Sequence, residues 1–150
     1  MSNLKYFVTT KVRGVIIHDE KLFLCKAQKN EGRGGFYCLP GGTLEPNEKR
    51  LECLEREIIE ELGVKPVIGK LIYTQEFVRD DGTTTFDFWY EITNGEDFLD
   101  VDISKCSHGF EHDEVGFYRS EDNFDTPVKP DHVWELLEEW REKRDFIQNT

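Results

Sequence analysis

Three glutamates at positions 57, 60 and 61 have a spacing that would bring their carboxylates together on a helix. At about 100° per residue, positions i, i+3 and i+4 fall within one stripe roughly 100° wide. Like charges at i and i+4 cost helix stability, whereas a hard divalent cation such as Mg²⁺ or Mn²⁺ prefers carboxylate oxygens. Glu57, Glu60 and Glu61 are therefore candidate metal ligands, although three acids on a helix are by themselves more often a solvated surface.

Two further charged residues accompany this stripe. Arg56 adjoins it, and Glu48 lies about two turns earlier, where a negative charge suits the N-terminus of a helix. Arg56 can pair with Glu48 or Glu52 and hold the helix against the preceding loop. Gly41 and Gly42, just before the helix, carry no side chain and let the backbone approach a metal or phosphate closely.

The helix that must carry these residues is predicted over 47–62. Leucine and isoleucine recur there at helical spacing. Asn47 is the expected N-cap, and Gly63 is the expected C-terminal capping residue.

The flanking sequence predicts strands and one more helix. A β-branched or alternating pattern predicts strands over 5–18, 21–27, 36–39, 67–78, 83–92 and 115–118. An apolar stripe predicts a helix over 131–146, and 95–112 has no clear pattern. Together these elements predict an α/β fold with helices on both faces of a mixed sheet, in one domain over 1–150.

The stretch from Gly42 to Val64 resembles a complete Nudix box. The family pattern is G-x5-E-x7-R-E-U-x-E-E-x-G-U, where U is a bulky aliphatic residue, and every fixed position is filled. Leu39 to Gly42 also resembles the L-P-G-G that commonly leads into the box. The resemblance implies a Nudix-like α/β/α sandwich with a mixed β-sheet between helices.

The resemblance also implies roles for individual residues. Glu57, Glu60 and Glu61 match metal-binding glutamates, with the Gly42 carbonyl as a further ligand. Glu48 and Arg56 match a supporting ion pair. Family members commonly recruit one more carboxylate from a C-terminal loop as ligand or general base. The candidates here are Glu111 and, as the alternative, Glu114, so the general base stays open among Glu57, Glu111 and Glu114.

The implied activity is hydrolysis of a phosphoanhydride bond with Mg²⁺ or Mn²⁺ as cofactor. The implied substrate is a small nucleoside diphosphate derivative, either an ADP-ribose-like compound or a (deoxy)nucleoside triphosphate. The alternatives are a non-catalytic nucleotide-binding Nudix sensor and a protein like the family's isoprenoid-diphosphate isomerases. Analogy with family members, which are often dimers, predicts a homodimer. The number of metal ions stays open.

Bulk composition narrows the partners and the location. The net charge of −12 disfavours duplex nucleic acid as a partner, because such a surface repels phosphate backbones. The chain shows no membrane-length apolar run and no signal peptide, so we expect a cytoplasmic protein. Four cysteines, with no C-x-x-C pair, give no zinc signature and read as buried thiols.

Some other side chains could also contact a substrate. Lys26 and Arg33 could reach phosphates, although exposed basic residues are the simpler reading. The histidines show no metal-ligand spacing, although His112 could line the site. Four aromatic residues could stack on a base, but most aromatics in a small domain belong to its core: Trp89, Tyr90, Phe110 and Phe117.

Overall fold

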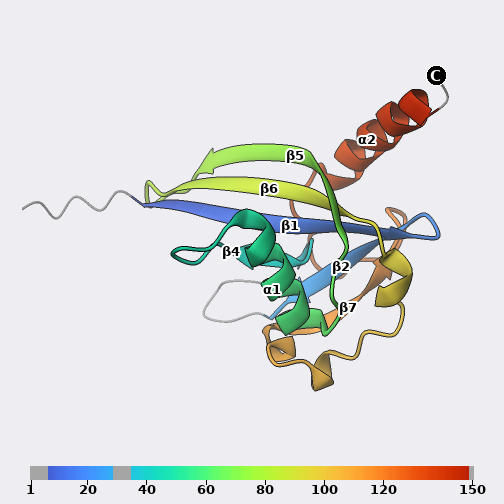
Figure 1. Cartoon of the computed structure of the whole chain (residues 1–150). Coiled ribbons are helices and arrows are strands. Elements are labelled where there is room, and N and C mark those ends of the chain that lie inside the picture. The colour runs from blue at the N-terminus through green and yellow to red at the C-terminus, as the bar shows by residue number, and fades with distance from the viewer. Residues whose placement is uncertain (1–6, 29–34, 149–150) are drawn as a thin grey trace, which may run out of the picture.

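A computed structural model of the chain describes residues 7–28 and 35–148, and side-chain burial as far as 143. Arg33 lies outside the described residues. Strands and helices follow one another along the chain (Figure 1). The strands are β1 (Val8–His18), β2 (Lys21–Ala27), β3 (Tyr37–Cys38), β4 (Gly41–Thr43), β5 (Ile68–Val78), β6 (Thr84–Ile92) and β7 (His112–Tyr118). The helices are α1 (Arg50–Leu62) and α2 (Val133–Gln148), with short 3₁₀ turns η1 (Gly95–Phe98), η2 (Ile103–Lys105) and η3 (Gly109–Glu111).

The strands form one mixed sheet in the order β3-β2-β1-β6-β5. β1 runs parallel to β6, and the other pairings are antiparallel. β1 and β2 pair only where the hairpin turns, at Ile17 and His18. Farther along β1, β4 takes the place of β2, and Gly14 N–H donates to the Pro40 carbonyl at 2.8 Å. Residues 38–42 therefore run between the two diverging parts of the sheet.

The two helices cover opposite faces of the sheet. Cys53, Leu54 and Ile58 of α1 pack with Val12 and Ile16 of β1 in one core cluster. A second cluster joins Val133 and Leu137 of α2 to side chains on the other face, namely Val15, Leu24 and Trp89. This arrangement confirms the predicted sheet between helices. It also buries both faces of β6, of which the alternating sequence had indicated only one.

Helix α1 ends where predicted but begins later. Gly63 adopts φ +72° and donates its N–H to the Ile59 carbonyl at 2.9 Å, a left-handed cap that glycine adopts without strain. Asn47 is not the N-cap: its φ of +65° places it in the preceding turn, and Lys49 occupies the cap position. Residues 47–49, which were predicted to belong to the helix, instead lead Glu48 back toward Arg56.

The segment without a clear pattern contains η1, η2 and η3, and η3 packs against α1. β7 begins at His112, earlier than the predicted 115, because it pairs with β2 through Ala27 and Lys26 despite its acidic sequence. Among the described residues, no helix is long and apolar enough to cross a membrane.

Candidate active site

Two of the predicted ligands, Glu57 and Glu61, lie on the side of α1 that faces the 38–42 segment. Glu61 is only 4% exposed, and its Oε2 atom has no hydrogen-bond partner among the described residues. Glu57 lies against Gly42 so closely that a Cβ built on Gly42 would be 2.2 Å from Glu57 Cδ. A side chain at position 42 would therefore displace the Glu57 carboxylate, which explains the glycine.

Arg56 is the centre of an ion-pair network. Its Nε and Nη2 atoms donate to Glu48 Oε2 and Oε1 at 2.6 and 3.0 Å, a two-point contact that matches the planar guanidinium. Its Nη1 atom lies 3.1 Å from both Glu57 Oε1 and Glu60 Oε2. Arg56 thus ties the loop before α1 to two of the three predicted ligands, and it partly neutralises them.

The shared charges shift two carboxyl groups in opposite directions. The hydrogen bond from Arg56 lowers the pKa of Glu48 to about 2. Burial and the neighbouring Glu61 carboxylate raise the pKa of Glu57 to about 7, although Arg56 opposes the rise. Glu57 therefore experiences a surplus of negative charge that a bound cation would relieve.

The loop with η3 brings Glu111 to the same place. Burial raises the pKa of Glu111, and the charge of Glu61 adds to that rise, which shows that the two carboxyl groups are neighbours. Glu114 is directed elsewhere, because its Oε1 accepts hydrogen bonds from the hydroxyls of Tyr37 and Tyr118. The structure thus brings Glu111, and not Glu114, to the glutamate cluster of Glu57, Glu60 and Glu61.

Two histidines also border the cluster: His108, which the sequence did not assign, and His112, which the sequence offered as a residue that could line the site. His108 Nδ1 lies 2.9 Å from Glu60 Oε2, and the backbone N–H of His108 donates to the Glu60 backbone carbonyl at 2.8 Å. His112 Nε2 lies 3.5 Å from Glu61 Oε2. No spacing in the sequence pairs them with α1, because the contact depends on how the irregular segment folds back.

The residues present fit a hard divalent cation. Glu61 offers a buried carboxylate oxygen without a hydrogen-bond partner among the described residues, and Gly42 leaves room for the Glu57 carboxylate. Carboxylate oxygens of this kind suit Mg²⁺ or Mn²⁺. In the described ranges, no three Asp, Glu, His or Cys side chains already converge to hold a metal. Arg56 holds Glu57 and Glu60, so these carboxylates must turn from it to complete a ligand set.

Other predicted substrate contacts are mostly engaged elsewhere. Lys26 Nζ donates to Asp125 Oδ2 at 2.8 Å. Tyr90 is buried in the core, Phe117 is packed against it, and Phe110 is 69% exposed beside His108.

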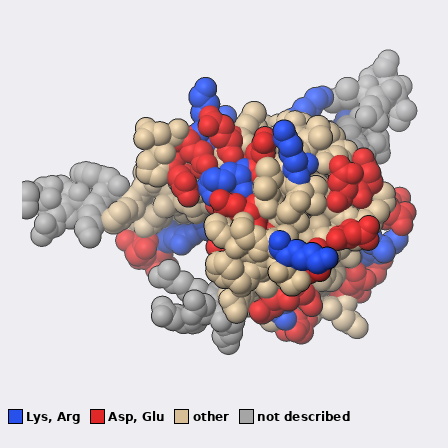
Figure 2. All heavy atoms as spheres, turned by 60° about the horizontal axis from the view of Figure 1, so that its bottom comes forward, with Lys and Arg blue, Asp and Glu red and all other residues tan. Residues whose placement is uncertain are grey.

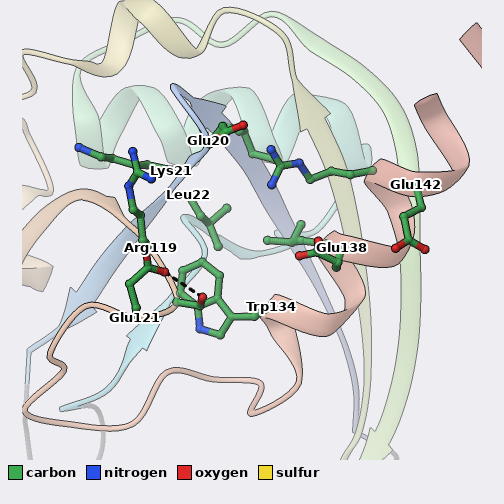
Figure 3. A pocket seen from close by; sticks show the side chains of 12 residues that line it. Glu20, Lys21, Leu22, Arg119, Glu121, Trp134, Glu138 and Glu142 are labelled. Carbon is green, nitrogen blue, oxygen red and sulfur yellow. Dashed lines mark hydrogen bonds between the residues drawn. The ribbon is translucent and has the colours of Figure 1, made fainter.

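One sizeable cavity lies away from the glutamate cluster. An open cavity of about 470 Å³ lies between β2, the loop after β7 and α2. Figure 3 shows Lys21 and Arg119 on one side and Glu138 of α2 on the other, with Leu22 and Trp134 between them. No predicted site residue lines it. On the face drawn in Figure 2, acidic side chains gather around a compact group of basic atoms, as expected from the net charge of −12.

Comparisons with known proteins show the family to which the chain is similar. The family model of the NUDIX domain matches residues 8–140. The chain is 29% identical over 65 residues to a CTP pyrophosphohydrolase of Escherichia coli, which is 43% of this chain and 48% of that protein. It is 41% identical over 61 residues to an ADP-ribose pyrophosphatase of Methanocaldococcus jannaschii, 41% of this chain and 36% of that protein. The matches thus span about half the length of these relatives or less.

The fold is also shared with solved structures. The MutT protein from Methanosarcina mazei superposes with a TM-score of 0.70 at 20% identity, over 95% of this chain and 99% of that chain. This likeness concerns the fold, whereas the family match covers most of the sequence, including all the glutamates above. The chain belongs to the Nudix family.

Proposed function

We propose that this chain is a divalent-metal-dependent hydrolase that cleaves a phosphoanhydride bond in a nucleoside diphosphate derivative. The substrate would be an ADP-ribose-like compound or a (deoxy)nucleoside triphosphate. The observation that carries the proposal is the buried, unpartnered Oε2 of Glu61 beside Glu57 and the Gly42 cradle. The names of the two relatives, a CTP pyrophosphohydrolase and an ADP-ribose pyrophosphatase, support the substrate class.

Glu57, Glu60, Glu61 and the Gly42 carbonyl would hold Mg²⁺ or Mn²⁺. Such an ion, when bound, neutralises phosphate charge and lowers the pKa of an attacking water. Arg56, anchored by Glu48, would keep the acids oriented without touching the reacting atoms. Phosphoryl transfer depends mostly on positioning and electrostatics, which this rigid helix and its ion pair supply.

Glu111 is the carboxylate that best fits the general base, and it would also serve as a metal ligand. Its raised pKa makes it a better proton acceptor than an ordinary glutamate, and Arg56 does not neutralise it. Glu57 is the alternative base, but it lies 3.1 Å from Arg56 Nη1 and is also a proposed ligand. A proton from the attacking water would pass to Glu111 at the edge of the cluster.

The experiment is product analysis by chromatography on a nucleotide panel with Mg²⁺, with Mn²⁺ and with chelator. The panel includes ADP-ribose, NADH, dinucleoside polyphosphates and normal and oxidised nucleoside triphosphates. Metal-dependent cleavage is expected, and the products identify the attacked phosphorus. Tight metal binding without any cleavage would overturn the hydrolase and favour a sensor or an isomerase. The cytoplasmic location, the single domain and the homodimer stay predictions.

A further inference from the structure

A second cavity, of about 360 Å³, lies on the α2 side of the sheet. Its floor is formed by neighbouring positions on three strands: Lys11 pairs with Asp87, which pairs with Gln75, and Arg13 pairs with Trp89. The opposite wall comes from the 35–42 segment and from the residues before α2. Its members are Phe36, Cys38, Leu39, Lys129 and Pro130, with Phe77 and Arg79 at the β5 end.

The charges of this cavity are opposite to those of the whole protein. Four cations line it, Lys11, Arg13, Arg79 and Lys129, against the single carboxylate of Asp87. The chain as a whole carries 31 acidic and 19 basic residues. We call this cavity the basic pocket. A concentration of cations in so acidic a protein costs stability through mutual repulsion unless an anion offsets it.

The protein itself offsets part of this charge, since Arg13 Nη1 donates to the Leu39 carbonyl at 3.1 Å and Arg79 interacts electrostatically with Asp81. Among the described residues, the side chains of Lys11 and Arg79 make no hydrogen bond or ion pair, and Arg13 Nε is 4.0 Å from Asp87 Oδ1. Burial, together with the charges of Arg13 and Arg79, lowers the pKa of Lys11 to about 8. An anion placed among these side chains would therefore gain from each of them.

The walls also suit a flat ring. Phe36, Phe77 and Trp89 line the basic pocket, and Lys129 Nζ lies 5.9 Å from the Phe36 ring centroid. Trp89 Nε1 and Asp87 Oδ1 are buried and have no hydrogen-bond partner among the described residues. A ligand group that reaches either atom would supply its missing hydrogen bond.

One short segment of the chain joins the wall of the basic pocket to the glutamate cluster. Cys38 and Leu39 line the pocket, and Gly42 cradles Glu57. Four residues of extended chain span at most about 14 Å, so Leu39 and Gly42 lie within that distance of each other. The basic pocket and the glutamate cluster are therefore neighbours along this segment.

We propose that the basic pocket binds an anionic group, a phosphate or a carboxylate, carried on or beside a flat ring at the substrate end remote from the cleaved diphosphate. That this ligand is a substrate rests on the proposed function, whereas the preference of the pocket for an anionic group does not. Arg79 and Lys11 are specificity-determining residues in this assignment, because their side chains make no hydrogen bond or ion pair with the described residues.

The test measures binding by calorimetry in chelator, with ligands that contain no anhydride bond. Adenosine 2′,5′-bisphosphate is compared with AMP, and orotidine 5′-monophosphate with UMP. Each pair differs by one anionic group, a phosphate in the first and a carboxylate in the second. The member with the extra anion is expected to bind about tenfold tighter in at least one pair, which corresponds to one charged hydrogen bond. Which pair discriminates identifies the group.

Lys11→Gln and Arg79→Gln are each expected to reduce that preference to about threefold or less, as is raising the salt concentration. Lys70→Gln is the matched control, because Lys70 is exposed on the same strand β5 and does not line the pocket. Equal affinities within both pairs would overturn the proposal, and so would a preference that both pocket variants retain in full.

The two proposals can fail separately. If the extra anion strengthens binding but no compound on the nucleotide panel is cleaved with metal, the hydrolase fails and the basic pocket stands. If cleavage occurs and neither ligand pair discriminates, the pocket assignment fails and the hydrolase stands.

Discussion

The carboxylate of Glu57 occupies the space that a side chain on residue 42 would need, since a Cβ on Gly42 would lie 2.2 Å from Glu57 Cδ. Gly42→Ala should therefore displace Glu57 and weaken binding of Mn²⁺ by about 10- to 100-fold, as loss of ligand orientation does elsewhere. Calorimetric titration with Mn²⁺ measures this. Gly116→Ala is the control, because its nearest contacts beyond the chain neighbours start at an ordinary 3.7 Å. Unchanged affinity in a folded Gly42→Ala protein would contradict the cradle.

Replacement of Glu60 or Glu61 by glutamine should abolish most metal-dependent turnover while the protein stays folded. We expect a loss of at least roughly 100-fold in kcat, because a neutral amide cannot replace a carboxylate ligand. Steady-state kinetics and circular dichroism measure the two effects. Glu52→Gln, an exposed change on the same helix, should retain activity. Wild-type rates in a folded Glu60→Gln or Glu61→Gln protein would remove the site assignment.

Glu111→Gln and Glu114→Gln should have different effects on catalysis. Glu111 neighbours Glu61, whereas Glu114 accepts hydrogen bonds from Tyr37 and Tyr118. Loss of a general base costs about 10²- to 10⁴-fold in rate, so kcat should fall that far only in Glu111→Gln. The acidic limb of its pH–rate profile should change as well. The opposite order of the two variants would assign the base to Glu114.

The ion pair between Glu48 and Arg56 should make stability depend on acid. The pKa of Glu48 is about 2 when folded, below its ordinary value of 4.5, because Arg56 donates hydrogen bonds to the charged form. A depressed pKa contributes stability above about pH 4.5, and that contribution is lost as the pH falls toward 2. Glu48→Gln should therefore lower the free energy of unfolding by about 1–2 kcal/mol at pH 6.

The measurement is urea denaturation of both proteins at pH 6 and pH 3. The difference between wild type and Glu48→Gln should shrink at pH 3, while Glu52→Gln should match wild type at both values. A difference that does not change with pH would show that the ion pair does not stabilise the fold in this way.

Most of the site on α1 could be predicted because its residues are close in sequence. Helical spacing alone places Glu57, Glu60 and Glu61 together, and Gly63 ends the helix where a left-handed cap is required. The predicted start of α1 was wrong because Asn47 is as favourable in a left-handed turn as at an N-cap. Local pattern cannot separate these two uses of asparagine.

The rest depends on contacts between distant segments. Lys11, Arg79 and Lys129 are far apart in sequence, and only the register of three strands and the loop before α2 brings them together. His108 meets Glu60 because an irregular segment folds back on α1. Nothing in the local composition of either region indicates these contacts.

The 38–42 segment has a consequence for how such a protein can change over evolutionary time. It separates the acids of α1 from a pocket built by strand faces elsewhere in the chain. Under the proposed assignment, substitutions at positions such as 11, 77 or 79 would alter which compound is bound without moving Glu57 or Glu61. The glutamate cluster would thus be inherited intact while ligand preference diverges among descendants of one ancestor.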